Sequence, residues 1–292
     1  MKTALQLSMA KAGGQLGRDG VPPVSEPACL FDPAWTRAKG NWPVDLERDE
    51  SLRQSFDVLR RKWGEVPFSR LERRMSADLL SLSDEQIIEK WREGYLGSSI
   101  GAAFSVRGWY QTLYLDAFRG KKILDVGCGL APDTVLFAQH GAVVTFLDII
   151  ESNVRFVERV CQIERIPNCS FCYMEDLNSL EMLPYDFDVI YCCGSFINAP
   201  LEVSRMEAQA ILKHLPVGGR WIELAYPKSR WEREGRSSEK EWGVRTDGGA
   251  PWMEWHDLHK VDYMLAPAAF DVVLALEFHN SDFNWFDLIR RE

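Results

Sequence analysis

The chain has 292 residues, of which 46% are apolar and 26% charged, and this is enough to bury the core of one large domain. Its 34 basic and 43 acidic residues give a net charge of −9, so a surface of this sign disfavours a nucleic-acid partner. No stretch approaches the roughly 20 apolar residues that span a bilayer, and residues 1–10 are too weakly apolar for a secretory signal, so no membrane partner is expected. The odd number of cysteines, seven, favours reduced thiols in a cytoplasmic protein.

The N-terminal part of the chain divides into two regions. Residues 1–45 are rich in glycine and proline without a sustained period, which predicts a loosely ordered arm. Residues 46–120 show a helical pattern and are predicted to form a lead-in or cap. Within them, Ser83 and Gln86 have the spacing of a capping box at the start of a helix. A further helix is predicted from Ala102 to Phe118.

From residue 121 to residue 292 the pattern changes to alternating strands and helices, which predicts a mostly parallel sheet. The final runs, Val272–Phe278 and Asn284–Ile289, flank His279–Asp282 and predict an antiparallel hairpin. The fold class is therefore α/β, with a Rossmann-like seven-stranded sheet that ends in this hairpin. The predicted strands are Lys122–Val126, Val143–Asp148, Ser170–Met174, Phe187–Cys192 and Arg220–Ala225, and the predicted helices are Pro132–Gln139, Glu151–Glu164 and Arg205–His214.

The turn after the first of these strands is the most informative segment. The strand ends in Asp125-Val126-Gly127-Cys128-Gly129, and a helical pattern follows at once. Glycines at this place let backbone N–H groups face a ligand without an intervening side chain. An acidic residue two positions before Gly127 favours a cationic adenosyl ligand over a pyrophosphate.

Over residues 105–292 the chain resembles the class I S-adenosylmethionine-dependent methyltransferases. The resemblance rests on the glycine motif, on acids after the second and third strands, on Gly194 after the fourth, and on Gly218-Gly219 before the fifth. It implies S-adenosyl-L-methionine as cofactor and S-adenosyl-L-homocysteine as product. The cofactor-binding residues that it implies are Arg107, Asp125, Gly127, Cys128, Gly129, Asp148, Ile149, Asp176, Leu177 and Gly194.

Several of these residues have a second interpretation. Asp148 is expected on the ribose hydroxyls, although a capping role at the strand end is the alternative. Asp125 is expected to face the amino group of the cofactor or to brace the glycine turn, and Asp176 to contact adenine or to begin a turn. Arg107 is either a carboxylate clamp or a surface arginine.

One departure from the family pattern concerns the third glycine of the motif. Ala131 stands at that place and Pro132 follows it. Proline suits the first turn of a helix but not the dinucleotide fingerprint, so it weighs against a nicotinamide-dependent oxidoreductase, the less favoured enzyme class.

A segment after the fifth strand, residues 226–269, is expected to lie on the substrate side. It combines tryptophans with acidic residues and two histidines. Indole rings bordered by carboxylates suit a sugar, an aromatic ring or an amine. His256 is the first candidate for a catalytic base and His259 the second, because a histidine pKa lies near neutral. Packing of the aromatic side chains on the sheet is the alternative, and no metal site is expected.

The sequence thus predicts an S-adenosylmethionine-dependent methyltransferase of a small molecule, with a sugar or natural-product hydroxyl as the favoured acceptor. N-methylation of a small amine is the first alternative. A non-catalytic subunit that retains S-adenosylmethionine is the alternative from another class, although Gly127, Gly129 and Asp148 are all present.

Overall fold

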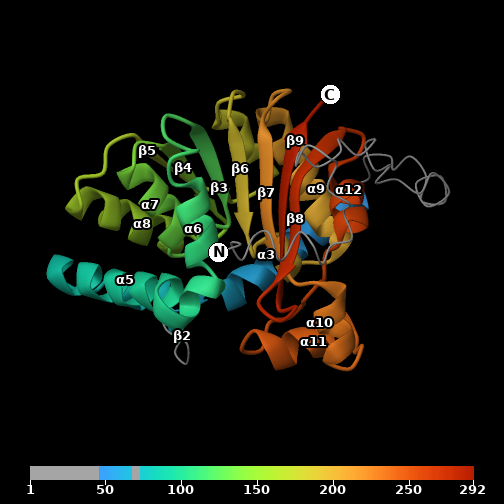
Figure 1. The fold of residues 1–292 in the computed structure, drawn as a ribbon. Helices are drawn as coiled ribbons and strands as arrows, with labels where there is room; N and C mark the ends of the chain where they lie inside the picture. The colour runs from blue at the N-terminus through green and yellow to red at the C-terminus, as the bar shows by residue number, and fades with distance from the viewer. Residues whose placement is uncertain (1–45, 68–72) are drawn as a thin grey trace, which may run out of the picture. The chain divides into compact units, whose positions relative to one another are not determined.

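The computed structural model describes residues 46–67 and 73–292, and the predicted N-terminal arm lies outside these residues. They contain a seven-stranded sheet in the order β5-β4-β3-β6-β7-β9-β8 (Figure 1). The first five strands in this order, β5-β4-β3-β6-β7, are parallel to one another. Strand β9 pairs antiparallel with both β7 and β8. The bounds are β3 Lys122–Val126, β4 Val143–Asp148, β5 Cys169–Tyr173, β6 Val189–Cys193, β7 Arg220–Ala225, β8 Phe270–Phe278 and β9 Phe283–Arg290. The predicted α/β fold with its C-terminal hairpin is confirmed.

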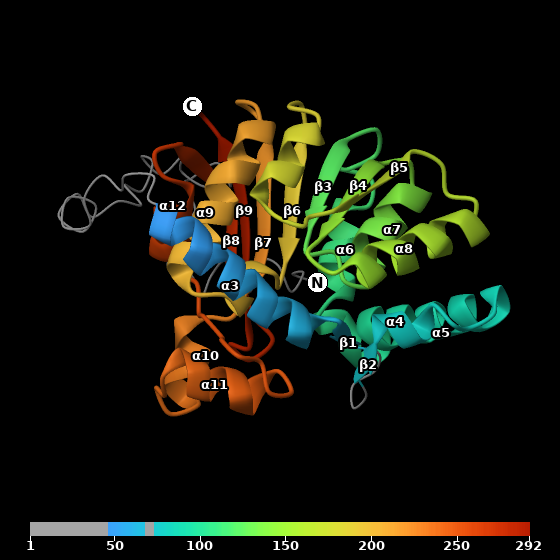
Figure 2. The same cartoon turned by 180° about the vertical axis from the view of Figure 1, so that it is seen from behind.

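Helices cover both faces of the sheet, which is why its central strands are apolar almost throughout. Alternate residues of each strand belong to two separate buried clusters: Leu124 faces one side and Ile123 the other. Figure 1 looks onto α6 and α7, and Figure 2 onto α3, α9 and α12. Around the sheet lie α7 Pro132–Gln139, α8 Glu151–Ile163, η2 Leu177–Met182, η3 Phe196–Asn198, α9 Leu201–Ile211 and η4 Leu212–His214.

The lead-in consists of short elements that precede the sheet. These are α3 Leu46–Trp63, β1 Glu65–Pro67, β2 Arg73–Met75, α4 Ser76–Leu79, α5 Asp84–Ser99, η1 Gly101–Ser105 and α6 Gly108–Tyr114. The capping box at α5 is present, because the Gln86 N–H donates to Ser83 Oγ and the Ser83 N–H donates to Gln86 Oε1. The single helix predicted over 102–118 was wrong, since η1 and α6 divide that range.

Three helices lie in the segment after β7: α10 Lys228–Arg233, α11 Glu239–Thr246 and α12 Leu258–Leu265. Figure 1 places α10 and α11 beyond the carboxyl ends of the parallel strands. Residues 251–257 are not helical, and α12 begins after Asp257, whose carboxylate accepts from the Lys260 N–H. Pro251 suits the first turn of a helix, and such a helix would align Trp252, Trp255 and His259 on one side, but no helix begins there.

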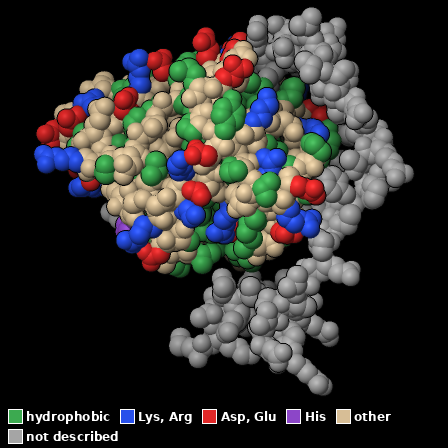
Figure 3. Space-filling model, turned by 90° about the horizontal axis from the view of Figure 1, so that it is seen from above, with side chains coloured by type: hydrophobic (Ala, Val, Ile, Leu, Met, Phe, Trp, Pro, Cys, Tyr) green, Lys and Arg blue, Asp and Glu red, His purple; other side chains and the backbone are tan. Residues whose placement is uncertain are grey.

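Two surface properties concern partners. Within 46–67 and 73–292, no helix combines the length and the apolar character that crossing a membrane requires. On the face drawn in Figure 3, basic and acidic side chains of the described residues are interspersed and not separated by sign.

Candidate active site

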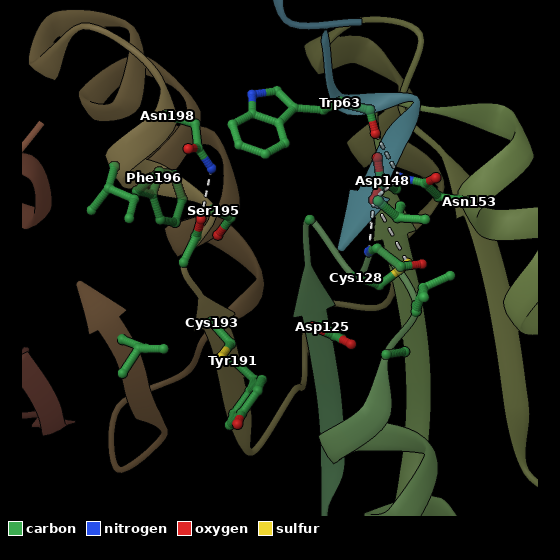
Figure 4. A pocket seen from close by; sticks show the side chains of 18 of the residues that line it. Trp63, Asp125, Cys128, Asp148, Asn153, Tyr191, Cys193, Ser195, Phe196 and Asn198 are labelled. Carbon is green, nitrogen blue, oxygen red and sulfur yellow. Dashed lines mark hydrogen bonds between the residues drawn. The ribbon is translucent and has the colours of Figure 1, made fainter. Parts of the chain in front are cut away.

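A cavity of about 360 Å³ lies at the carboxyl ends of β3, β4, β6 and β7. Its size is within the range of small-molecule sites. Figure 4 shows Cys128, Asp148 and Asn153 on one side, Ser195, Phe196 and Asn198 on the other, and the Trp63 indole between them. Of the predicted cofactor-binding residues, those that line the cavity are Arg107, Asp125, Gly127, Cys128, Gly129, Asp148, Ile149 and Gly194.

The glycine turn after β3 has a conformation that favours glycine. Gly127 has φ 69° and Gly129 has φ 53°, in the left-handed region. A Cβ atom on Gly127 would lie 2.7 Å from the Cβ of Ser195, so the turn after β3 and the loop after β6 touch at this point. The turn is held against β4, because the N–H groups of Gly127 and Cys128 both donate hydrogen bonds to the Leu147 carbonyl.

Asp148 ends β4 and is 5% exposed. Its carboxylate accepts hydrogen bonds from the Gly129 N–H at 2.9 Å, the Ile150 N–H at 2.8 Å and Asn153 Nδ2 at 3.1 Å. Burial raises the pKa of this carboxyl, and the three donors oppose that rise. Asp148 therefore braces the glycine turn and at the same time lines the cavity.

Asp125 lies in β3, two residues before Gly127, and is 4% exposed. The hydroxyl of Thr134, in the first turn of α7, donates to its carboxylate. Burial, together with the nearby charges of Asp133 and Asp148, raises the pKa of Asp125 to about 8. A cation bound in the cavity would favour the ionised form of this carboxyl.

Arg107 precedes α6 and reaches the cavity from the lead-in. Its guanidinium donates to the carboxylate of the buried Asp133 at 3.2 Å, and Asp133 also accepts from Gln111 at 2.6 Å and from the Tyr191 hydroxyl at 2.9 Å. The Arg107 side chain is a quarter exposed and lines the cavity, where a ligand carboxylate could pair with it.

Residues 123–219, which contain this turn, Asp148 and the loop after β6, match the family model of a methyltransferase domain. The chain carries a methyltransferase domain. The predicted resemblance to the class I S-adenosylmethionine-dependent methyltransferases is thus confirmed.

Known proteins resemble the methyltransferase domain in sequence and in fold. A ubiquinone biosynthesis O-methyltransferase of Pseudomonas fluorescens is 35% identical over 81 residues, which are 28% of this chain and 34% of that protein. The chain therefore spans about a third of the length of the curated relatives that it matches. The structure of magnesium protoporphyrin IX methyltransferase from Synechocystis PCC 6803 with bound SAH aligns with a TM-score of 0.50 and 18% identity, over 70% of this chain and 94% of that one. The structure of a protein from Pyrococcus horikoshii OT3 aligns with a TM-score of 0.51 and 16% identity, over 66% of this chain and 92% of that one. At these identities the two structures share the fold.

Asp176 and Leu177 do not line the cavity of the methyltransferase domain. The Asp176 carboxylate accepts from the Asn178 N–H at 2.9 Å and forms a capping box with Ser179 at the start of η2. The turn interpretation therefore describes Asp176 better than the adenine contact does. Met174, the residue directly after β5, does line the cavity.

His256 and His259 also lie away from the cavity lining. His256 is fully buried, and its Nδ1 is 2.6 Å from Oε1 of Glu223, which is itself buried on β7. His259 is exposed on α12. This placement does not support either histidine as a base that touches an acceptor, and it gives His256 a structural contact that the sequence pattern did not indicate.

We expect His256→Ala to destabilise the fold by about 3 kcal/mol, because it leaves the Glu223 carboxylate buried without this partner. Chemical denaturation measures the change, and cofactor affinity should stay as in the unmodified protein. His259→Ala, at an exposed position, is the matched control and should cost much less. A stable His256→Ala variant with turnover lowered about 100-fold would restore His256 as the base.

The aromatic segment after β7 contributes less to the cavity than its composition suggests. Tyr226 and Asp247 line it, and the Tyr226 hydroxyl donates to Asp247 at 3.0 Å. Trp242 is fully buried and donates to Glu234, and Trp231 packs against Trp255. For these three tryptophans, packing is the correct interpretation.

Several cavity residues were missed by the sequence analysis. They come from the lead-in, from the loop after β6 and from α9, and they include Trp63, Trp91, Tyr95, Ser195, Asn198 and Glu207. The position of Ser195 directly after Gly194 was a usable signal. The others are aromatic residues on the apolar faces of helices, or single polar residues. Whether such residues reach the cavity depends on how the helices pack.

Proposed function

We propose that this protein is an S-adenosylmethionine-dependent methyltransferase that acts on a hydroxyl group of a small molecule, a sugar or a natural product. The observation that carries the proposal is the cavity between the glycine turn and Asp148, within the segment that matches the methyltransferase domain. The O-methyltransferase that is 35% identical over part of the chain supports oxygen as the acceptor atom.

The cavity suits this cofactor chemically. The carboxyl groups of Asp125, Asp148 and Glu207 line it, and Asn153 Oδ1 is a buried acceptor without a partner among the described residues. A ligand rich in donors and positive charge matches such a lining, whereas a pyrophosphate would be repelled. This favours S-adenosylmethionine over a nicotinamide dinucleotide.

When bound, the cofactor supplies an electrophilic methyl group next to a sulfonium charge. In our proposal Asp148 accepts from the ribose hydroxyls, Asp125 faces the ammonium group and Arg107 pairs with the carboxylate. The protein contributes mainly by holding donor and acceptor in line, since the methyl group is already activated.

Glu207 adds a second weakly acidic carboxyl to the cavity. It lies half-buried on α9, and the described residues provide it with neither a hydrogen bond nor an ion pair. Burial and the nearby charge of Asp148 raise its pKa to about 8. A small amine would also suit this carboxyl, which keeps N-methylation as the second candidate function.

We expect the affinity for S-adenosylmethionine to rise with pH between about 6.5 and 8.5. The pKa of Asp125 is raised to about 8, so below that pH the cation must displace a proton on binding. Affinity should change by up to about tenfold per pH unit for each carboxyl that ionises. Calorimetry in two buffers of different ionisation enthalpy counts the protons released. Asp125→Asn should flatten the profile, and an unchanged slope in that variant would exclude Asp125 as the titrating group.

The test of the function is transfer of a labelled methyl group from S-adenosylmethionine to panels of hydroxylated aromatics, sugars and small amines. Product from a hydroxylated compound supports the proposal, and product from amines alone would replace it with N-methylation. Cofactor binding without any product would favour the non-catalytic subunit.

We also propose a cytoplasmic location, which the free thiols of the described cysteines support.

A further inference from the structure

Four buried polar atoms of residues that line the cavity have no hydrogen-bond partner among the described residues. Two of them are Oδ1 of Asn153 and Oγ of Ser195, and the other two, from different walls, are Nε1 of Trp63 and Oδ1 of Asn198. In this last pair, one is a donor and the other an acceptor. Buried polar groups are nearly always paired, so two orphans that line one cavity point to a ligand. In Figure 4 the Trp63 indole extends toward Asn198, with its nitrogen at the end that faces this residue.

From this pair we infer that the methyl acceptor is a hydroxylated aromatic molecule, whose hydroxyl group lies between Trp63 Nε1 and Asn198 Oδ1. The inference rests on the proposed function and narrows its substrate class. A hydroxyl matches both atoms, because its oxygen accepts from the indole N–H while its proton is donated to the amide oxygen. An ether cannot donate, and an ammonium group cannot accept.

Trp63 is held in place before any ligand binds. It is the last residue of α3, and its carbonyl accepts from Asn153 Nδ2 at 3.4 Å, which links it to the side chain that braces Asp148. The Arg73 guanidinium lies 5.2 Å from the centre of the indole ring and pairs with Asp247 at 3.2 Å. This cation–π contact helps to hold the indole ring in place.

Asn198 is oriented equally well. Its Nδ2 donates to the Gly194 carbonyl at 2.6 Å, so Oδ1 is the atom left without a partner. The short helix η3 that carries it is anchored at two carbonyls, because Ser204 Oγ donates to Phe196 O at 2.7 Å and the Glu254 N–H donates to Ile197 O at 2.7 Å. A fixed acceptor of this kind selects a ligand that can donate.

The remaining walls favour a planar ring. The aromatic residues that line the cavity with Trp63 are Phe56, Trp91, Tyr95, Tyr191, Phe196, Tyr226 and Phe283. In the transfer step a lone pair of the acceptor oxygen forms the O–C bond as the S–C bond breaks. The donor leaves as a neutral thioether, and the hydroxyl proton passes to water. A phenolic hydroxyl ionises near pH 10, so it loses this proton more readily than an alcohol does.

The experiment measures how the protein saturated with S-adenosylhomocysteine binds four probes: phenol, anisole, cyclohexanol and toluene. We expect phenol to bind best, because anisole lacks the donated proton and cyclohexanol lacks the planar ring. Trp63→Phe removes the indole N–H and keeps an aromatic ring. It should therefore lower the affinity for phenol about 3- to 10-fold, the range for one neutral hydrogen bond, and leave the affinity for toluene unchanged. Titrations followed by NMR give these ratios directly.

The control is Trp109→Phe. Trp109 also has a buried Nε1 without a partner, but it does not line the cavity, so phenol affinity should not change. Equal binding of phenol and anisole, binding of no probe, or an unchanged phenol affinity in Trp63→Phe would each overturn the inference. Failure of S-adenosylhomocysteine to bind the unmodified protein would instead overturn the proposed function.

Discussion

Replacing Gly127 by alanine should lower the affinity for S-adenosylhomocysteine by about 100-fold or more. The new methyl group would lie 2.7 Å from the Cβ of Ser195, and the backbone at φ 69° already disfavours an L side chain. Strain at such a position costs about 1–3 kcal/mol, and the clash forces the turn after β3 and the loop after β6 apart. Both segments line the cavity, so its shape changes where the cofactor is proposed to bind.

A matched substitution separates this effect from general strain. Gly120 has a similar φ of 73°, nothing lies within 4 Å of a Cβ built there, and it does not line the cavity. Gly120→Ala should therefore lower stability without changing cofactor affinity, with both quantities measured by calorimetry and denaturation. Equal losses of affinity in the two variants would mean that the contact between Gly127 and Ser195 does not shape the site.

Asp148→Asn should weaken cofactor binding by about 1.5–3 kcal/mol, or roughly 10- to 150-fold. This is the range for hydrogen bonds to a charged group. The carboxylate accepts from Gly129, Ile150 and Asn153, and an amide would place an N–H group against at least one of these donors. The substitution thus removes the charge and one of the two oxygens of the ribose acceptor that we propose, and it disturbs the glycine turn as well.

Asp176→Asn is the control for Asp148→Asn, because Asp176 also accepts from a backbone N–H but does not line the cavity. Its effect should be confined to the cap of η2, with cofactor affinity unchanged in an equilibrium titration. If Asp176→Asn weakened binding more than Asp148→Asn did, the two acidic residues would have to exchange roles.

The sheet was predictable because its signals are local. The bounds of β3, β4 and β7 agree with the predicted strands, since buried parallel strands are short apolar runs that end at glycine or polar residues. The hairpin turn was equally clear, and His279, Asn280 and Ser281 all adopt positive φ. Eight of the predicted cofactor residues line the cavity, and seven of them do so because the ends of parallel strands meet at one edge of a sheet. The eighth, Arg107, reaches it from the lead-in.

The acceptor side was not predictable in the same way. His256 was a candidate base because of its residue type, but its partner Glu223 lies 33 residues away in the chain. The packing of residues 251–257 against β7 brings the two together. Trp63 and Asn198 belong to segments that are 135 residues apart in the chain, and it is the fold that brings both to one cavity. Composition indicated an aromatic segment, but packing decided which rings face the ligand.

The most direct test of the cofactor assignment is calorimetric titration of the protein with S-adenosylhomocysteine, with NADH titrated in parallel. We predict binding of S-adenosylhomocysteine in the micromolar range and no binding of NADH, because acidic residues surround the glycine turn and would repel a pyrophosphate. Binding of NADH, or of neither compound, would contradict the role assigned to the turn at Gly127 and to Asp148.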